Sequence, residues 1–355
     1  MPEPIVRDAA EAAALEYGAA IVLEPLREFL DAAGLGSGEI EASELGEGHS
    51  NLTFLLRRGE ERIVLRRPPR GELAGSANDV LRESRILEAL GRTAVPVPEV
   101  LGLCEDTELI GAPFFLMSYV PGATINGGLP AALDRPEAPA LVAKEVVGAL
   151  VGLHDADLEA SGLGGFGRPS GYLERQLRRF GSLLEANATR PLPELGRVAD
   201  WLAGNLPRSR RTTFVHGDYR LGNLLFGDPL GLAAVLDWEM ATVGDPLADL
   251  GYLTATWAAP EDEENPMLAL SRLTRRPDFP RREDLADAYA EVTGDPLDSL
   301  PWYQVLALWK SAIFLEGSYR RFTEGASTDP YFASLADGVP ALARAALAWT
   351  ARNPT

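Results

Sequence analysis

The feature that most constrains the fold is the segment 214–239, in which polar residues alternate with short apolar runs. The first apolar run leads into a His-Gly-Asp triplet that ends at Asp218, and Asn223 follows five positions later. A second apolar run, a Gly-Asp-Pro turn and a third apolar run occupy 224–236 and end in Asp237. Strand-forming residues on both sides of a turn predict a hairpin. The hairpin and the loop before it would hold two carboxylates and one amide at fixed positions.

This spacing of two carboxylates and an amide is typical of a kinase catalytic loop and the metal-binding strand that follows it. Asp218 would accept a hydrogen bond from an acceptor hydroxyl and orient it toward the γ-phosphorus of a nucleotide. Asn223 and Asp237 would supply the hard oxygen ligands that Mg²⁺ prefers. The alternative is a buried structural histidine beside a capping aspartate, which accounts for the triplet but not for the strand that ends in Asp237.

The chain as a whole resembles the aminoglycoside phosphotransferase family, which comprises small-molecule kinases with a protein-kinase-like fold. The matching segments follow the family's order and are 46–53, 63–69, 82–90, 115–122, 150–155, the catalytic loop and 237–250. The resemblance implies an α+β, bilobal fold, with a small N-lobe of antiparallel sheet plus helix and a larger, mainly helical C-lobe. It also implies that Asp218 is the catalytic base and that Asn223 and Asp237 bind Mg²⁺.

The resemblance further sets the expected lobe boundaries and the nucleotide. We expect a nucleotide-binding N-lobe at 1–117, a hinge at 118–122, and a C-lobe at 123–355 that holds the catalytic loop and the acceptor pocket. In kinases the hinge backbone binds the adenine edge, so the peptide units of Ser118 and Val120 would contact the base. The resemblance implies ATP as the nucleotide, and GTP stays open because backbone groups read the base.

A glycine-rich turn at 46–51 stands where a kinase covers the nucleotide phosphates. In that arrangement backbone N–H groups and a small side chain contact the phosphates. In this chain Ser50 and Asn51 would supply these contacts. A glycine-rich turn taken alone also fits an ordinary hairpin, so the assignment depends on the position of the turn within the family pattern.

The strand 63–69 lacks the lysine that the family uses to bind the α- and β-phosphates. Because side chains alternate along a strand, only one of Arg66 and Arg67 can point into the cleft. We expect Arg66, which stands at the family's lysine position and can bind phosphate bidentately. Glu83, on a predicted helix, would pair with it. The alternatives are a solvated edge position for Arg66 and a surface salt bridge for Glu83.

The formal net charge of −19 repels polyanions, so we expect neither nucleic acid nor an anionic membrane as a partner. A cationic small acceptor is compatible with this charge, and the acidic run 261–264 would suit a polycation, although both features also serve solubility. Cys104 is the single cysteine, which excludes an internal disulfide. Neither a secretory leader nor a membrane-spanning apolar run is expected. These observations favour a cytoplasmic protein, and they do not indicate its oligomeric state.

Apolar periodicity and turn residues predict the remaining elements. The expected strands are 44–48, 51–58, 62–67, 97–104 and 113–120, and the expected helices are 21–33, 79–90, 136–154, 172–186, 195–206, 283–292, 302–321 and 331–352. At the end of one helix, His154 fits a core or capping position better than a catalytic one. The resemblance assigns Asp249 to bracing the catalytic-loop backbone, whereas Asp245 fits a helix cap.

The predicted reaction is transfer of the γ-phosphoryl group of ATP to a hydroxyl of a small molecule, in the manner of an aminoglycoside phosphotransferase. The strand Val-Leu-Arg-Arg-Pro-Pro at 64–69 resembles the branch of this family that is fused to acyl-CoA dehydrogenases, so a hydroxyacyl thioester or another hydroxylated metabolite is the alternative acceptor. A nucleotide-binding pseudokinase is a third hypothesis, because the usual lysine is missing. The retained Asp218, Asn223 and Asp237 weigh against it.

Overall fold

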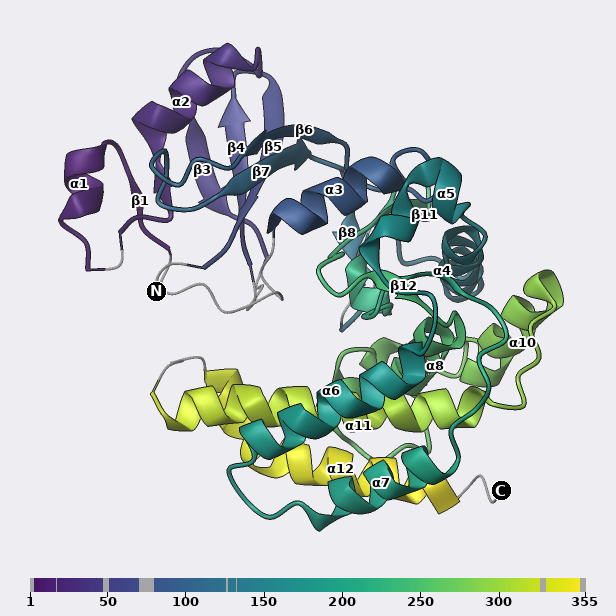
Figure 1. Cartoon of the computed structure of the whole chain (residues 1–355). Coiled ribbons are helices and arrows are strands. Elements are labelled where there is room, and N and C mark those ends of the chain that lie inside the picture. The colour runs from purple at the N-terminus through teal and green to yellow at the C-terminus, as the bar shows by residue number, and fades with distance from the viewer. Residues whose placement is uncertain are drawn as a thin grey trace. The chain divides into compact units, whose positions relative to one another are not determined.

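The computed structural model describes residues 3–16, 18–46, 51–69, 80–125, 127–131, 133–325 and 330–351 (Figure 1). The chain forms two compact units. The N-terminal unit contains residues 1–121 together with 236–240, and the helical unit contains 122–235 and 241–355. Asp237 therefore belongs to the N-terminal unit, although it lies more than a hundred positions beyond the rest of that unit in the sequence.

The N-terminal unit is built on an antiparallel sheet with the strand order β3-β4-β5-β7-β6. Its strands are β3 (Glu41–Glu44), β4 (Leu52–Arg58), β5 (Glu61–Arg67), β6 (Val100–Cys104) and β7 (Phe114–Ser118). Helix α2 (Leu23–Ala32) buries Leu26 and Leu30 in one cluster with Phe54, Leu65 and Leu116 of the sheet. Helix α3 (Val80–Leu90) contacts β6 and β7. Shorter elements are β1 (Ile5–Val6), α1 (Ala9–Ala13) and β2 (Ile21–Val22).

Several predicted boundaries in this unit are wrong, and two of the differences have a clear physical cause. The first strand of the sheet spans Glu41–Glu44 rather than 44–48. It is an edge strand whose residues are mostly exposed, so it lacks the apolar alternation that marks a half-buried strand. The predicted helix 21–33 begins only at Leu23, because Ile21 and Val22 are buried and pair with β1 in a short parallel ladder.

The helical unit places two small antiparallel ladders among its helices. Its elements are β8 (Ala123–Thr124), α4 (Ala138–His154), α5 (Leu158–Ser161), α6 (Tyr172–Asn187), α7 (Pro193–Gly204), β9 (Thr213–Val215), β10 (Leu224–Gly227), β11 (Gly231–Val235), β12 (Thr242–Gly244), α8 (Leu247–Thr256), α9 (Pro266–Ala269), α10 (Arg282–Thr293), α11 (Leu300–Thr323) and α12 (Leu335–Ala351). Strand β10 pairs with β11 and β8, and β9 pairs with β12. The predicted hairpin is thus confirmed, and the loop 216–223 is held between two paired strands.

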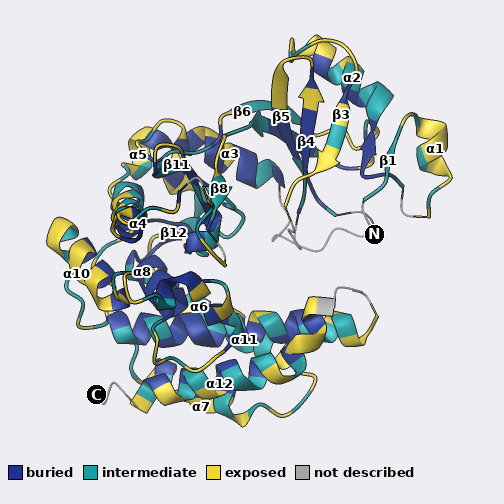
Figure 2. Ribbon diagram, turned by 180° about the vertical axis from the view of Figure 1, so that it is seen from behind, coloured by how far each residue is buried: buried dark blue, intermediate teal, exposed yellow. Residues whose placement is uncertain are grey.

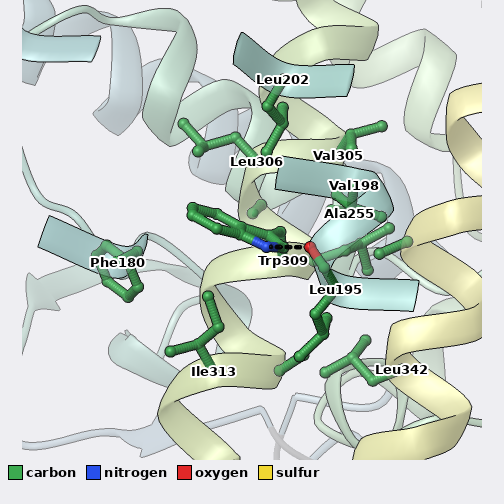
Figure 3. Close-up of a cluster of buried hydrophobic side chains, with 14 of the residues drawn as sticks. Phe180, Leu195, Val198, Leu202, Ala255, Val305, Leu306, Trp309, Ile313 and Leu342 are labelled. Atoms are coloured by element: carbon green, nitrogen blue, oxygen red, sulfur yellow. Dashed lines mark hydrogen bonds between the residues drawn. The ribbon is translucent and has the colours of Figure 1, made fainter. Parts of the chain in front are cut away.

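The core of the helical unit surrounds α11, which packs against α6, α7, α8 and α12. Trp309 lies at its centre, where its indole N–H donates to the carbonyl of Leu195 at 3.0 Å (Figure 3). Figure 2 shows α8 and much of α11 as buried. Trp302 and Trp309 are core residues, whereas Phe314 on the same helix is 52% exposed. Among the described helices, none is long and apolar enough to cross a membrane.

The terminal helix starts later than predicted. The predicted helix 331–352 is replaced by a 3-10 turn at Pro330–Ser334 followed by α12 from Leu335. The turn packs against α11 and α12. The apolar periodicity of the sequence cannot predict such a tertiary contact.

The close approach of α8 and α11 gives the first testable prediction. A Cβ atom on Gly251 of α8 would lie 2.5 Å from the Cβ of Tyr303 on α11, whereas a Cβ on the exposed Gly148 of α4 would meet no atom within 4 Å. We expect Gly251→Ala to lower the free energy of unfolding by about 1–3 kcal/mol through overpacking. Gly148→Ala, the matched control, should raise it by about 0.5–1 kcal/mol through helix propensity. Urea unfolding measures both, and equal effects of the two variants would contradict the described packing.

Candidate active site

The catalytic loop of the helical unit is anchored by Asp249, a fully buried residue of α8. Its carboxylate accepts the backbone N–H groups of His216 at 2.6 Å and Gly217 at 2.8 Å. Gly217 has a φ of 86°, which favours glycine in this turn. The buried His154 lies 3.3 Å from the Asp249 carboxylate and 2.8 Å from the Tyr289 hydroxyl. His154 is therefore a core residue that supports the brace.

The protonation state of Asp249 follows from this arrangement. Burial alone would raise the pKa of its carboxyl group, but the hydrogen bond and charge of His154, the nearby His216 and the Gly217 N–H hold that pKa below its ordinary value. The anionic brace that the sequence assigned to Asp249 is present, and it fixes the start of the loop.

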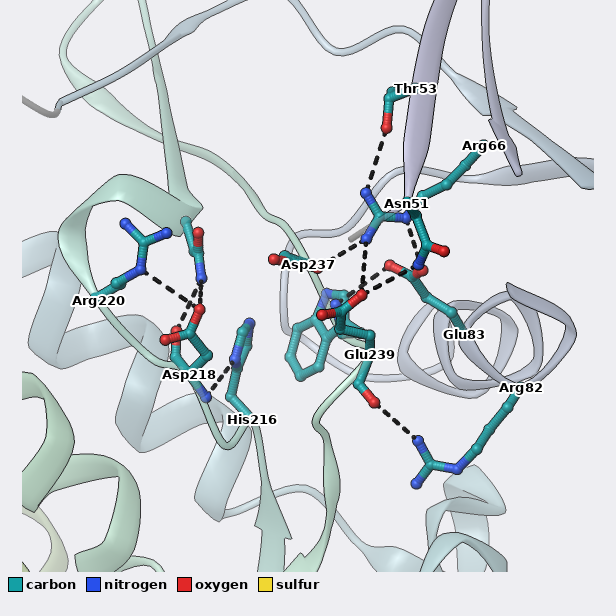
Figure 4. Close-up of polar contacts among 12 residues, drawn as sticks. Asn51, Thr53, Arg66, Arg82, Glu83, His216, Asp218, Arg220, Asp237 and Glu239 are labelled. Atoms are coloured by element: carbon teal, nitrogen blue, oxygen red, sulfur yellow. Dashed lines mark hydrogen bonds and ion pairs between the residues drawn. The ribbon is translucent and has the colours of Figure 1, made fainter. Parts of the chain in front are cut away.

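Asp218 lies in this loop with its side chain 24% exposed. The Asn223 amide donates to its carboxylate at 2.8 Å and to its backbone carbonyl at 2.9 Å (Figure 4). Arg220 Nε lies 3.4 Å from the same carboxylate oxygen, and the Tyr252 hydroxyl of α8 is within hydrogen-bonding range of the carboxylate. A carboxylate offers about four acceptor positions, so it retains capacity for an acceptor hydroxyl.

Asn223 is oriented by the same contacts. Because its Nδ2 donates to Asp218, its amide oxygen points away from that residue and can serve as a hard ligand. The buried side chain is fixed by the loop rather than free to rotate. Its geometry is compatible with the predicted metal-binding role.

The N-terminal unit contains a second polar cluster, centred on Arg66 of β5. The guanidinium donates to Glu83 of α3 at 2.7 Å and to Asp237 at 2.7 Å, and it lies 3.7 Å from Glu239 (Figure 4). It also donates to the Thr53 hydroxyl at 3.3 Å. The side chains of Arg66 and Glu83 are 14% and 3% exposed. The predicted pair of Arg66 and Glu83 is therefore present as a buried ion pair and not as a surface salt bridge.

The charges of this cluster depend on one another. Burial would lower the pKa of Arg66, but the three carboxylates around it raise that pKa overall. Burial raises the pKa of Glu83, and its contacts with Arg66 only partly offset the effect. The guanidinium is thus the group that keeps a buried carboxylate ionised.

Arg67 points to the opposite face of β5, as strand alternation predicts. Its guanidinium donates to the backbone carbonyls of Ala20 at 2.6 Å, Ile110 at 3.0 Å and Ala19 at 3.1 Å. Its side chain is buried. Arg67 is a structural residue, and Arg66 is the one that faces the polar cluster.

Asp237 adopts a backbone conformation that non-glycine residues rarely take. Its φ is 66°, and among the described residues it is the one non-glycine position with a positive φ. Such a conformation costs about 1–3 kcal/mol and concentrates at functional sites. The next N–H, that of Trp238, donates to Glu83 at 3.3 Å. The segment is therefore held so that the carboxylate of Asp237, one-third exposed, faces Arg66 and can also offer oxygen to a cation.

Glu239 is the residue of this cluster that the sequence did not single out. Its carboxylate accepts the Asn51 amide at 3.1 Å, and its backbone carbonyl accepts Arg82 at 3.4 Å. The Asp-Trp-Glu spacing, two carboxylates separated by one residue, was the signal that could have revealed it. Asn51 thus contributes a side-chain contact to the cluster, and Ser50 lies outside the described residues.

The predicted hinge begins at the end of β7. The Ser118 N–H donates to the Glu99 carbonyl at 2.8 Å, and the Ser118 hydroxyl accepts the Glu99 N–H at 2.9 Å. Val120 lies two residues beyond β7, outside regular structure.

The predicted magnesium ligands are Asn223 and Asp237. Within the described ranges, no cluster of three or more His, Cys, Asp or Glu side chains is arranged to hold a metal. The amide of Asn223 and the carboxylate of Asp237 each carry a hard oxygen, which is the donor type that Mg²⁺ prefers.

Comparison with known proteins identifies the relatives of the chain. A family model described as the phosphotransferase enzyme family matches residues 41–290. Acyl-CoA dehydrogenase family member 10 of Mus musculus is 36% identical over 298 residues, covering 81% of this chain and 27% of that protein. Acyl-CoA dehydrogenase family member 11 of Gallus gallus is 32% identical over 297 residues, covering 81% of this chain and 38% of that protein. The chain therefore spans about a quarter to two fifths of the length of these curated relatives.

Solved structures show the same fold. A Ralstonia eutropha protein described as an aminoglycoside phosphotransferase aligns with a TM-score of 0.76 at 28% identity, over 94% of this chain and 99% of that one. A ternary complex of aminoglycoside phosphotransferase APH(4)-Ia with AMP-PNP and hygromycin B aligns with a TM-score of 0.60 at 19% identity, over 92% and 98% of the two chains. The predicted kinase-like α+β fold is confirmed.

The Arg66 cluster generates a stability prediction. Arg66→Met would leave the buried Glu83 without its cation, which typically costs about 3–5 kcal/mol. Burial already raises the pKa of Glu83, and loss of Arg66 raises it further. The loss of stability, which is the deficit of Arg66→Met relative to the wild type, should therefore grow as the pH rises through that pKa. The deficit should shrink as pH falls from neutrality toward the ordinary glutamate pKa of 4.5.

Urea unfolding combined with hydrogen exchange in β5 and α3 measures this effect. Arg66→Met/Glu83→Gln should recover part of the lost stability at neutral pH because the buried charge is removed. Arg57→Met, on the exposed part of β4, is the matched control and should change stability by less than about 0.5 kcal/mol. A pH-independent deficit, or no recovery in the double variant, would contradict the assignment.

Proposed function

Because the chain belongs to the phosphotransferase enzyme family, we propose that it transfers the γ-phosphoryl group of ATP to a hydroxyl group of a small molecule. The observation that carries this proposal is the catalytic loop. Asp218 is fixed by Asn223 and Arg220 and remains accessible, while Asp249 braces the backbone beneath it. This is the arrangement that positions an acceptor hydroxyl for in-line attack on a phosphoryl group.

In the proposed reaction each polar residue has a separate role. Asp218 accepts the hydrogen bond of the acceptor hydroxyl and takes its proton as the new O–P bond forms and the bond to the leaving ADP breaks. Asn223 and Asp237 are the residues that would hold Mg²⁺, and the bound ion would neutralise charge on the phosphates. Arg66 binds the α- and β-phosphates in place of the family's lysine, and Glu83 keeps it oriented.

The remaining nucleotide contacts follow the predicted pattern. Ser50 and Asn51 cover the phosphates, and the backbone of Ser118 and Val120 contacts the base. The AMP-PNP complex of APH(4)-Ia, which has the same fold, supports a nucleotide as the ligand. ATP is the proposed donor, and backbone recognition admits GTP as well.

A second acceptor class is favoured by the sequence relatives. Curated proteins that match this chain are named acyl-CoA dehydrogenase family members, and the chain matches only part of each. We propose a hydroxyacyl thioester as the alternative to an aminoglycoside-like acceptor. Phosphorylation of one compound class from a panel of aminoglycosides, amino alcohols, sugars and hydroxyacyl thioesters discriminates between them.

The test of the proposed function is Asp218→Asn, which keeps the size of the side chain and removes its basicity. We expect kcat to fall about 10²–10⁴-fold, the usual contribution of a general base, while ATP affinity stays within about threefold. A coupled assay of ADP release with Mg²⁺ measures the rate, and titration calorimetry measures nucleotide binding.

Asp200→Asn, at an exposed position of α7, is the matched control and should leave both quantities unchanged. Phosphoryl transfer that survives in Asp218→Asn would contradict the proposed role. Nucleotide binding without turnover of any acceptor in the wild type would instead favour the pseudokinase hypothesis.

A further inference from the structure

Lys310 is one of two lysines in the chain and lies on α11, the central helix of the helical unit. Its ammonium is 4.8 Å from the centroid of the Phe180 ring of α6, and the residue is half-buried. Among the described residues, no carboxylate lies within ion-pair distance of it, in contrast to the buried Arg66 and to Arg190, which pairs with Glu316. A half-buried cation without a counter-ion is costly unless a ligand supplies the missing charge.

Lys310 belongs to the surroundings of the catalytic loop. The hydroxyl of Tyr252 on α8 is within hydrogen-bonding range of both Asp218 and Ser311, the residue next to Lys310. The negative charge of Asp218 also acts directly on the Lys310 ammonium. A molecule whose hydroxyl meets Asp218 can therefore extend toward this ammonium.

The charges that act on Lys310 are of both signs. Burial lowers its pKa to about 8, with a further contribution from Arg179 of α6, and Asp249 and Asp218 offset only part of the effect. The Asp218 carboxylate is itself shared with Arg220, which lies 3.4 Å from it.

The acidic run 261–264, which the sequence offered as a surface for a polycation, is largely occupied. Glu261 pairs with Arg281, and Asp262 pairs with Arg282. Glu264 lies 3.5 Å from Arg272 and 3.6 Å from Arg275. Three of the four acidic residues that would have attracted a polycationic acceptor are therefore paired within the chain.

We propose that Lys310 binds an anionic group, a carboxylate or a phosphate, of the acceptor whose hydroxyl is phosphorylated. This inference rests on the proposed function for the hydroxyl and names the chemistry at the other end of the acceptor. The enzyme accordingly discriminates against polycations and takes hydroxylated anions, including thioesters that carry phosphate groups.

Direct binding is measurable because the chain has only two lysines. With [¹³Cε]lysine, the side chains of Lys144 and Lys310 give two signals, which Lys144→Arg assigns. The probes are 4-hydroxybutyrate, glycerol 3-phosphate and 3-hydroxybutyryl-CoA, with 4-hydroxybutyramide, glycerol and kanamycin as neutral and cationic counterparts. We expect a saturable shift of the Lys310 signal with at least one anion and none with its counterparts. No shift with any anion, or equal shifts with neutral probes, overturns the proposal.

Kinetics of Lys310→Met provide the second measurement. For the anionic acceptor that reacts, the loss of one charge-assisted contact should raise KM about tenfold or more, with kcat and the KM for ATP within about threefold. Lys310→Arg should restore most of the affinity, and Lys144→Met is the matched control. An unchanged acceptor KM, or an equal loss for neutral acceptors, overturns the assignment.

Two readouts separate this inference from its alternatives. If Lys310 served only to stabilise the fold, Lys310→Met would have a lower free energy of unfolding than the wild type. If its ammonium is an unpaired, half-buried charge, Lys310→Met should be at least as stable as the wild type at pH 7. A Lys310 shift with anions but no phosphoryl transfer would support the anion site and contradict the proposed function. Transfer only to neutral or cationic acceptors would support the function and overturn the anion site.

Discussion

The buried guanidinium of Arg66 is the interaction on which the N-terminal polar cluster depends. It contacts Glu83 and Asp237 at 2.7 Å each, and it thereby joins strand β5, helix α3 and the distant segment 236–240. A buried carboxylate such as Glu83 is tolerable only with a cation beside it. The same guanidinium donates to Asp237, whose φ of 66° is left-handed. One arginine therefore contacts the proposed metal ligand and is also the proposed phosphate-binding residue.

Sequence patterns predicted the residues whose roles depend on local spacing. The loop spacing identified Asp218 and Asn223, and strand alternation separated Arg66 from Arg67. What the sequence could not show were contacts made by tertiary packing. Glu239 contacts Asn51, nearly two hundred positions earlier, and Tyr252 of helix α8 meets Asp218 of the catalytic loop. The edge strand β3 was misplaced because an exposed strand carries no apolar alternation.

Charge illustrates the difference between composition and placement. The net charge of −19 is compatible with a cationic acceptor, and the acidic run 261–264 would suit a polycation. In the folded chain Glu261, Asp262 and Glu264 pair with arginines, whereas Lys310 has no ion-pair partner among the described residues. Overall charge governs solubility and long-range attraction, but the preference of a site depends on the few groups that line it.

The most direct test of the central role of Arg66 is calorimetric binding of Mg²⁺–AMP-PNP to the wild type, Arg66→Lys and Arg66→Met. If Arg66 replaces the phosphate-binding lysine, Arg66→Met should bind at least about tenfold more weakly, since it loses a charged contact to phosphate. Arg66→Lys should retain most of the affinity. Hydrogen exchange on the same samples would verify that β5 and α3 remain folded. Unchanged affinity in a folded Arg66→Met would contradict the account.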